Sequence, residues 1–91
     1  MKYVYPALFT ACEEGGYDVR FPDLEINTQG DDLYEALYMA EALLNEWIEY
    51  LTYKNMEIPK ASNLQDIKFD DGQFVSLIRA EVGVSEVAVS A

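Results

Sequence analysis

Alternation of apolar and polar positions predicts a β-strand at the start of the chain. Over residues 2–9, one face of such a strand carries Tyr3, Tyr5, Ala7 and Phe9, and the other carries Val4, Pro6 and Leu8. Because Pro6 has no backbone N–H, we expect either an edge strand or a strand whose missing N–H faces no neighbour.

Two further strands follow before residue 31. Residues 13–16 (EEGG) predict a tight turn, because glycines supply the positive φ angles that a hairpin needs. Residues 17–21 (YDVRF) alternate, which indicates a half-buried strand. The Pro-Asp pair at residues 22–23 interrupts it, and residues 24–29 predict a third, shorter strand before Gly30 turns the chain.

A long amphipathic helix comes next. Asp32 and Glu35 have the spacing of a capping box, in which each side chain accepts a hydrogen bond from the backbone N–H of the other residue. The helix is expected over residues 33–53, ending at Lys54 and Asn55. Helical spacing predicts that it buries one apolar stripe, made of Leu33, Leu37, Ala40, Leu44, Trp47 and Leu51.

The rest of the chain adds one strand to this framework. Residues 58–63 predict a loop, residues 70–72 a turn, and residues 74–82 a last strand. The fold class is therefore α+β in the order β-β-β-α-β, an antiparallel meander packed against one long helix with a fourth strand after it. We expect residues 1–82 to form a single domain, and residues 83–91 to be a short tail that frays or pairs with another chain.

Charge narrows the class of partner. The 91 residues hold 17 acids and 6 Lys or Arg, a net charge of −11. Nucleic acid is not an expected ligand, because phosphate binding needs a basic patch. A basic protein is the natural partner, since opposite fields speed encounter, although acidity that serves only solubility is the alternative reading. The N-terminal residues fit neither a signal peptide nor a membrane span, so a cytoplasmic location is expected.

Catalytic chemistry finds little support in the residues. There is no His, and Cys12 is the single cysteine, so an internal disulfide, the usual zinc sites and His-based nucleophile pairs are excluded. Residues 2–9 hold no acid, which argues against a two-metal nuclease. Cys12 precedes two glutamates that would raise its pKa, so it is expected to be inert. We predict no catalytic residue, no cofactor and no metal site.

Four sequence motifs together resemble the HicB family of antitoxins. They are EEGGY at 13–17, FPDL at 21–24, TQGDD at 28–32 and EAL at 35–37, and the likeness covers about residues 1–55. The resemblance implies a partly degraded ribonuclease-H-like domain that has lost its metal carboxylates. It also implies an antitoxin of a type II toxin–antitoxin system, whose partner is a small basic HicA-like mRNA ribonuclease toxin.

The chain departs from the family in two places. Family members commonly carry a DNA-binding portion after the fourth strand, whereas here nine residues without a basic side chain follow Val82. Residues 25–27 (EIN) stand where many members have Pro-Gly-Cys. We therefore expect no separate DNA-binding domain and no direct nucleic-acid binding by this chain alone.

Two functional classes stay open at this point: an antitoxin that masks a basic ribonuclease, and a stand-alone acidic HicB-like regulatory or ligand-binding module without a toxin partner. A homodimer or higher oligomer is expected because the core is small. The candidate dimer contacts are Tyr34 and Tyr38, which lie off the apolar stripe. The candidate partner-binding residues are acids near the rim of the sheet: Glu13, Glu14, Asp18, Asp23 and Glu25.

Overall fold

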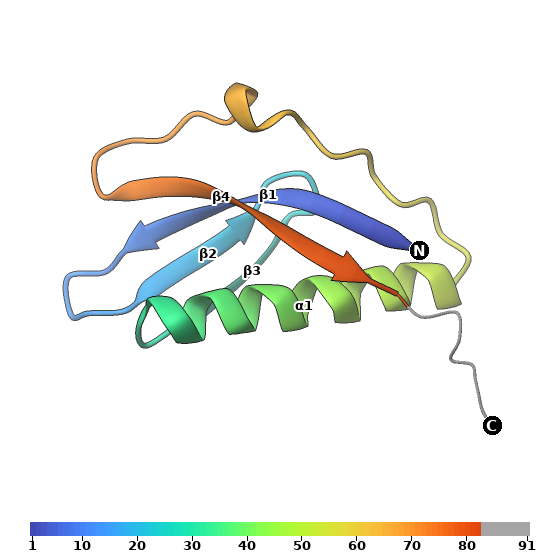
Figure 1. Cartoon of the computed structure of the whole chain (residues 1–91), viewed down its shortest axis with the longest axis horizontal. Helices are drawn as coiled ribbons and strands as arrows, with labels where there is room; N and C mark the ends of the chain where they lie inside the picture. The colour runs from blue at the N-terminus through green and yellow to red at the C-terminus, as the bar shows by residue number, and fades with distance from the viewer. Residues whose placement is uncertain (83–91) are drawn as a thin grey trace.

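One long helix lies against a four-stranded antiparallel sheet (Figure 1). The computed structural model describes residues 1–82, and the predicted tail at 83–91 lies outside the described residues. The predicted β-β-β-α-β order is confirmed, with a short 3₁₀ turn added before the last strand. The elements are β1 (Lys2–Ala11), β2 (Tyr17–Phe21), β3 (Ile26–Gly30), α1 (Leu33–Tyr53), η1 (Leu64–Asp66) and β4 (Gln73–Glu81).

The strand order β3-β2-β1-β4 makes β1 an interior strand. Of the two alternatives predicted for Pro6, the edge strand is excluded and the second, a missing N–H that faces no neighbour, holds. Successive backbone N–H groups of a strand point to opposite neighbours. The N–H of odd-numbered Ala11 donates to Gly72 O on the β4 side, so the N–H groups of even-numbered β1 residues face β2. The ladder with β2 begins only at Leu8 opposite Arg20, so the missing N–H of Pro6 lies beyond its end.

The two faces of the sheet are covered differently. One face packs on α1 and forms the core with Tyr5, Ala7, Phe9, Val19, Phe21, Ile78 and Ala80. The connection over residues 54–72, which includes η1, runs along the other side (Figure 1). Pro6 is buried there, whereas Val4 and Leu77 stay about half exposed, at 49% and 53%. This second face is hereafter the outer sheet face.

Local capping sets both ends of α1 where the sequence predicted them. The Asp32 carboxylate accepts from the Glu35 N–H at 2.8 Å, as expected, but the Glu35 carboxylate accepts from the Asp31 N–H at 2.6 Å rather than from that of Asp32. At the other end Asn55 adopts φ 59°, and the Met56 N–H donates to Leu51 O at 2.9 Å. This is the Schellman arrangement, with asparagine in the place glycine usually takes.

The apolar stripe of α1 is rotated from the predicted one. The helix buries Ala36, Ala40, Leu44, Ile48 and Leu51. Leu33 is 41% exposed, and Trp47 is only partly buried against the core. The small Ala36 faces the sheet because α1 approaches Gly30 closely: a Cβ on Gly30 would lie 2.3 Å from the Ala36 nitrogen.

Candidate protein-binding surface

The acids predicted as partner contacts lie at three separate places. Glu13 and Glu14 occupy the turn between β1 and β2, and both are exposed. Gly15 and Gly16 take φ values of 100° and 86°, and the Cys12 N–H donates to Gly16 O at 3.0 Å, which fixes the turn. The two carboxylates therefore stand in solvent at one end of the sheet.

Asp23 and Glu25 lie at the opposite end, in the turn between β2 and β3. The Asp23 carboxylate accepts from the Ser62 N–H at 2.9 Å and from the Ser62 hydroxyl at 2.5 Å. Asp23 thus has a structural role that sequence reasoning missed, because its partner is distant in the chain. Glu25 is exposed and holds a positive φ of 56°.

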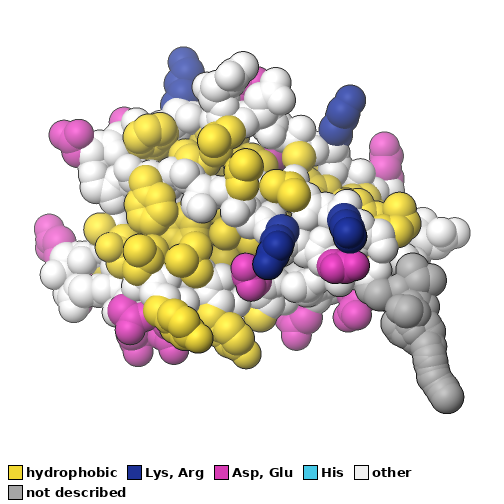
Figure 2. All heavy atoms as spheres, viewed as in Figure 1, with side chains coloured by type: hydrophobic (Ala, Val, Ile, Leu, Met, Phe, Trp, Pro, Cys, Tyr) yellow, Lys and Arg dark blue, Asp and Glu magenta, His cyan; other side chains and the backbone are white. Residues whose placement is uncertain are grey.

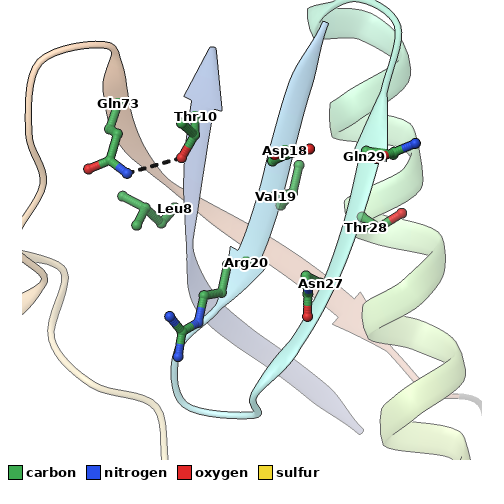
Figure 3. A pocket seen from close by; sticks show the side chains of 9 residues that line it. All are labelled: Leu8, Thr10, Asp18, Val19, Arg20, Asn27, Thr28, Gln29 and Gln73. Atoms are coloured by element: carbon green, nitrogen blue, oxygen red, sulfur yellow. Dashed lines mark hydrogen bonds between the residues drawn. The ribbon is translucent and has the colours of Figure 1, made fainter. Parts of the chain in front are cut away.

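Asp18 lies on the outer sheet face, in a groove of about 680 Å³. Figure 3 shows its lining side chains coming from neighbouring strands, with the Gln73 amide donating to the Thr10 hydroxyl at 3.1 Å. The groove mixes Asp18 with Arg20 and with uncharged polar groups, among them Thr10, Asn27, Gln29 and Gln73. It offers hydrogen bonds of both kinds rather than a concentrated negative charge.

A larger acidic surface lies on the solvent side of α1. No Lys or Arg occurs between Arg20 and Lys54, whereas eight acids do: Asp23, Glu25, Asp31, Asp32, Glu35, Glu41, Glu46 and Glu49. Opposite the buried stripe, exposed tyrosines and carboxylates share the solvent side of the helix. We call this surface the outer helix face and define it by Tyr34, Tyr38, Glu46, Glu49 and Tyr53.

The outer helix face has the chemistry to receive cationic side chains. Tyr34 and Tyr53 are each 83% exposed and Tyr38 is 62% exposed. A carboxylate binds an Arg or Lys by a charge-assisted hydrogen bond, and the face of a tyrosine ring attracts the same cations. Lys54 already lies over the Tyr53 ring, with its Nζ 5.7 Å from the ring centroid. The sequence signal was visible as tyrosines and glutamates off the apolar stripe, but only Tyr34 and Tyr38 were selected from it, as dimer contacts.

Metal-ligating side chains do not cluster in the described part of the chain. Among residues 1–82 there is no group of three or more His, Cys, Asp or Glu that could hold a metal ion. Partial burial first, and then the negative charges of Asp18 and Glu14, raise the pKa of the Cys12 thiol. The predicted rise of this pKa through a following glutamate is confirmed for Glu14, and Asp18 of β2 adds to it. Neither helical segment of residues 1–82 has the length and apolar character of a membrane span.

A model of one protein family matches most of this domain. It is described as the HicB-like antitoxin of bacterial toxin–antitoxin systems, and it matches residues 4–71. The chain belongs to this family. The resemblance inferred from the four motifs is confirmed, and the match extends past the helix into the connection that precedes β4.

A named relative and two solved structures resemble this HicB-like chain. Antitoxin HicB 1 of Photorhabdus laumondii is 46% identical over 56 residues, which are 60% of this chain and 36% of the relative, so the chain spans about a third of that protein's length. A chain of a toxin–antitoxin complex from Streptococcus pneumoniae matches with a TM-score of 0.81 at 24% identity, over all of this chain and 80% of its own length.

The second structure is a chain of the HicA3 and HicB3 toxin–antitoxin complex. It matches with a TM-score of 0.69 at 20% identity, over 87% of this chain and 99% of that chain. At these identities the two structures establish a shared fold. The HicB-like fold class predicted from the sequence is confirmed by both.

Proposed function

We propose that this domain is an antitoxin that binds a small basic HicA-like ribonuclease toxin and covers the surface on which the toxin would hold mRNA. Membership of the HicB-like antitoxin family supports the class of function. Both structures of similar fold are chains of toxin–antitoxin complexes. The observation that carries the proposal is the outer helix face, where carboxylates and exposed tyrosines stand together in a stretch that has no Lys or Arg between Arg20 and Lys54.

Electrostatic complementarity is the mechanism of recognition. A protein that binds RNA must present Lys and Arg to the phosphates, and those cations are the groups that carboxylates attract. Glu46 and Glu49 would pair with toxin cations, while Tyr34, Tyr38 and Tyr53 would supply apolar area and ring faces. The occupied toxin surface could then no longer bind RNA. Glu13 and Glu14, at the end of the sheet, extend the negative field that steers the encounter.

Tyr34 and Tyr38 fit this role better than a contact between two copies of the chain. They share a shallow depression with Asp31, Asp32 and Glu35. A second copy placed there would bring like charges together, whereas a cationic protein would neutralise them.

The form of action that we propose is inhibition by binding rather than by catalysis, and the side chains available support it. The whole chain lacks His, the Cys12 pKa is raised, and residues 1–82 hold no metal-ligand cluster. Such a chain inhibits a toxin by occupying it stoichiometrically.

Co-expression tests the proposal against the stand-alone alternative. The chain is produced in bacteria together with a short, basic, His-containing toxin encoded beside it, and growth and co-purification are measured. We expect the toxin alone to stop growth, and co-expression to restore growth and yield a complex. Restored growth should require equimolar antitoxin. Continued arrest with no complex would overturn the antitoxin proposal and favour the stand-alone module.

A matched pair of variants locates the contact. Glu46→Lys combined with Glu49→Lys reverses two charges of the outer helix face. Glu57→Lys combined with Asp71→Lys changes the net charge equally in the connection on the other side of the sheet. We expect the helix variant to lose protection from the toxin and the connection variant to keep it. Equal loss in both would show that total charge, rather than this face, governs binding.

A further inference from the structure

Strand β4 leaves the backbone groups of its outer side without partners. Its even-numbered residues bond to β1, as shown at the end of the ladder, where the Val82 N–H donates to Met1 O at 2.9 Å. The N–H and C=O groups of Val75, Leu77 and Arg79 therefore point away from the sheet. Within residues 1–82 these three N–H groups make no hydrogen bond outside the ladder, whereas the next one, of Glu81, donates to the Asn45 side chain at 3.2 Å.

The two edges of the sheet differ in how well they are protected. β3 has five residues, follows the positive-φ Glu25 and ends at Gly30, so it offers little to a new strand. β4 has nine residues, contains no proline and keeps an unbroken register with β1 from Gln73 to Glu81. In Figure 1 the connection over residues 54–72 runs above β4, where η1 packs against the strand, and no described segment crosses in front of β4. An open edge of this length is a template for another strand.

Exposed apolar side chains accompany the open edge. Leu77, which pairs with Pro6 of β1, is 53% exposed, and Val4 of β1, which pairs with Arg79, is 49% exposed. Leu64 of η1 and Phe69 of the segment leading to β4 are exposed by 44% and 57%. Figure 2 shows hydrophobic side chains gathered along the middle of this view, over β4 and β1.

Charge selects the kind of partner for this edge. Lys2 and Arg79 line one depression with Glu41 and Glu81, so the region near the end of β4 is close to neutral in a chain of net charge −11. A basic toxin bound here would face the cations Lys2 and Arg79, and it would lie away from the acids of the outer helix face. A second copy of the chain meets a near-neutral surface and keeps its acids apart.

We propose that β4 pairs antiparallel with β4 of a second copy, with the two-fold axis at Leu77. In this register Leu77 faces Leu77 of the second copy, and Val75 faces Arg79 of the second copy. Each outward N–H and C=O of Val75, Leu77 and Arg79 then finds its complement, as a two-fold interface requires. Like charges never stand opposite each other, and the half-exposed Leu77 side chains bury one another. The two sheets become one continuous sheet, and both outer helix faces stay free.

Oligomeric state and amide exchange of the full chain test the pairing. Light scattering at high micromolar concentration should give twice the 10.3 kDa mass of the chain. Amides of Val75, Leu77 and Arg79 should be protected at that concentration and exchange rapidly on dilution. A monomer at all concentrations, or rapid exchange of these amides in the dimer, would overturn the proposal. Protection that arises only on adding the toxin would show that the toxin, rather than a second copy, occupies the edge.

Matched variants separate strand pairing from a general apolar contact. Leu77→Lys places like charges on the axis and should give a monomer. Val4→Lys puts the same charge on the same face of interior strand β1 and should leave the dimer intact. Leu77→Pro removes an outward N–H that β1 does not use, and should also give a folded monomer by circular dichroism. A dimer that survives both Leu77 variants would contradict the pairing, whatever the outcome of toxin binding.

Discussion

Asp23 and Ser62 join two segments that are 39 residues apart in the chain. The carboxylate in the β2–β3 turn accepts from both the backbone N–H and the hydroxyl of Ser62, at 2.9 and 2.5 Å. This contact fastens the connection over residues 54–72 to the end of the sheet. It holds the connection at Ser62, just before η1, against the turn between β2 and β3.

Removal of the Asp23 carboxylate should loosen this connection. We expect Asp23→Ala to lower the free energy of unfolding by about 1–2 kcal/mol, because two hydrogen bonds to a charged acceptor are lost. Urea denaturation measures the change. Glu25→Ala, which truncates an exposed acid in the same turn, should change it by less than about 0.5 kcal/mol. Equal effects of the two substitutions would show that the Asp23 contact contributes nothing.

Gly30 is required because α1 passes directly over it. A Cβ at Gly30 would lie 2.3 Å from the Ala36 nitrogen and 2.6 Å from its Cα, so Gly30→Ala must push the helix away from β3. The expected loss is about 3 kcal/mol, the upper range for overpacking. Gly15→Ala is the control: nothing lies within 4 Å of its added Cβ, and only the positive φ opposes it, for about 1 kcal/mol. Thermal unfolding that ranks the two variants the other way would contradict the close approach.

Stability should fall at alkaline pH through Tyr5. The Tyr5 hydroxyl donates to the Pro59 carbonyl. Burial is the largest cause that raises the pKa of Tyr5 above 10.0, and electrostatic interactions with Tyr3 and Asp23 raise it further. A raised folded-state pKa gives stability that is present below pH 10 and is lost as pH rises through the folded-state value. We expect Tyr5→Phe to cost about 1 kcal/mol at neutral pH.

The pH dependence of that difference is the decisive readout. The gap in unfolding free energy between wild type and Tyr5→Phe should shrink above pH 10, because only the wild-type hydroxyl must stay protonated in the fold. Tyr34→Phe, at a side chain that is 83% exposed, serves as the control for general alkaline effects. If the difference in unfolding free energy between wild type and Tyr5→Phe stays constant up to pH 11, ionisation of the Tyr5 hydroxyl does not affect stability and the prediction is wrong.

Local sequence patterns were sufficient for most of the elements. The Asp32 cap, the Asn55 terminator and the glycine turn act within a few residues, so the bounds of α1 and the first hairpin follow from the chain directly. Contacts between elements distant in the sequence determine the features that were predicted wrongly. The stripe of α1 was misjudged because its rotation depends on Ala36 meeting Gly30, a contact no periodicity reveals.

The candidate surface was only partly predictable for the same reason. Acidity pointed to a cationic partner, but the strand order and the long connection determine which acids share a face. The structure places Glu13 and Asp23 at opposite ends of the sheet. The carboxylates that do lie together, Glu46 and Glu49, were not among the predicted contact residues.

The exposed turn between β1 and β2 offers a test of long-range steering. Glu13→Lys combined with Glu14→Lys should weaken toxin binding without unfolding the domain, because both residues lie in an exposed turn held by backbone hydrogen bonds. We expect the loss mainly in the association rate, about threefold to tenfold, since rim charges act on encounter. Surface plasmon resonance with the purified toxin measures it. Unchanged association would remove the hairpin from the interface and from the steering field.

The association rate between the domain and its basic toxin, measured from about 50 to 500 mM salt, tests the central claim most directly. For wild type the account predicts a rate that falls steeply with salt, because screening shortens the reach of the field. For the Glu46→Lys and Glu49→Lys variant it predicts a slow rate that is nearly independent of salt. The Glu57→Lys and Asp71→Lys control should follow wild type. A salt-independent rate for wild type, with unchanged affinity in the helix variant, would contradict electrostatic recognition through the outer helix face.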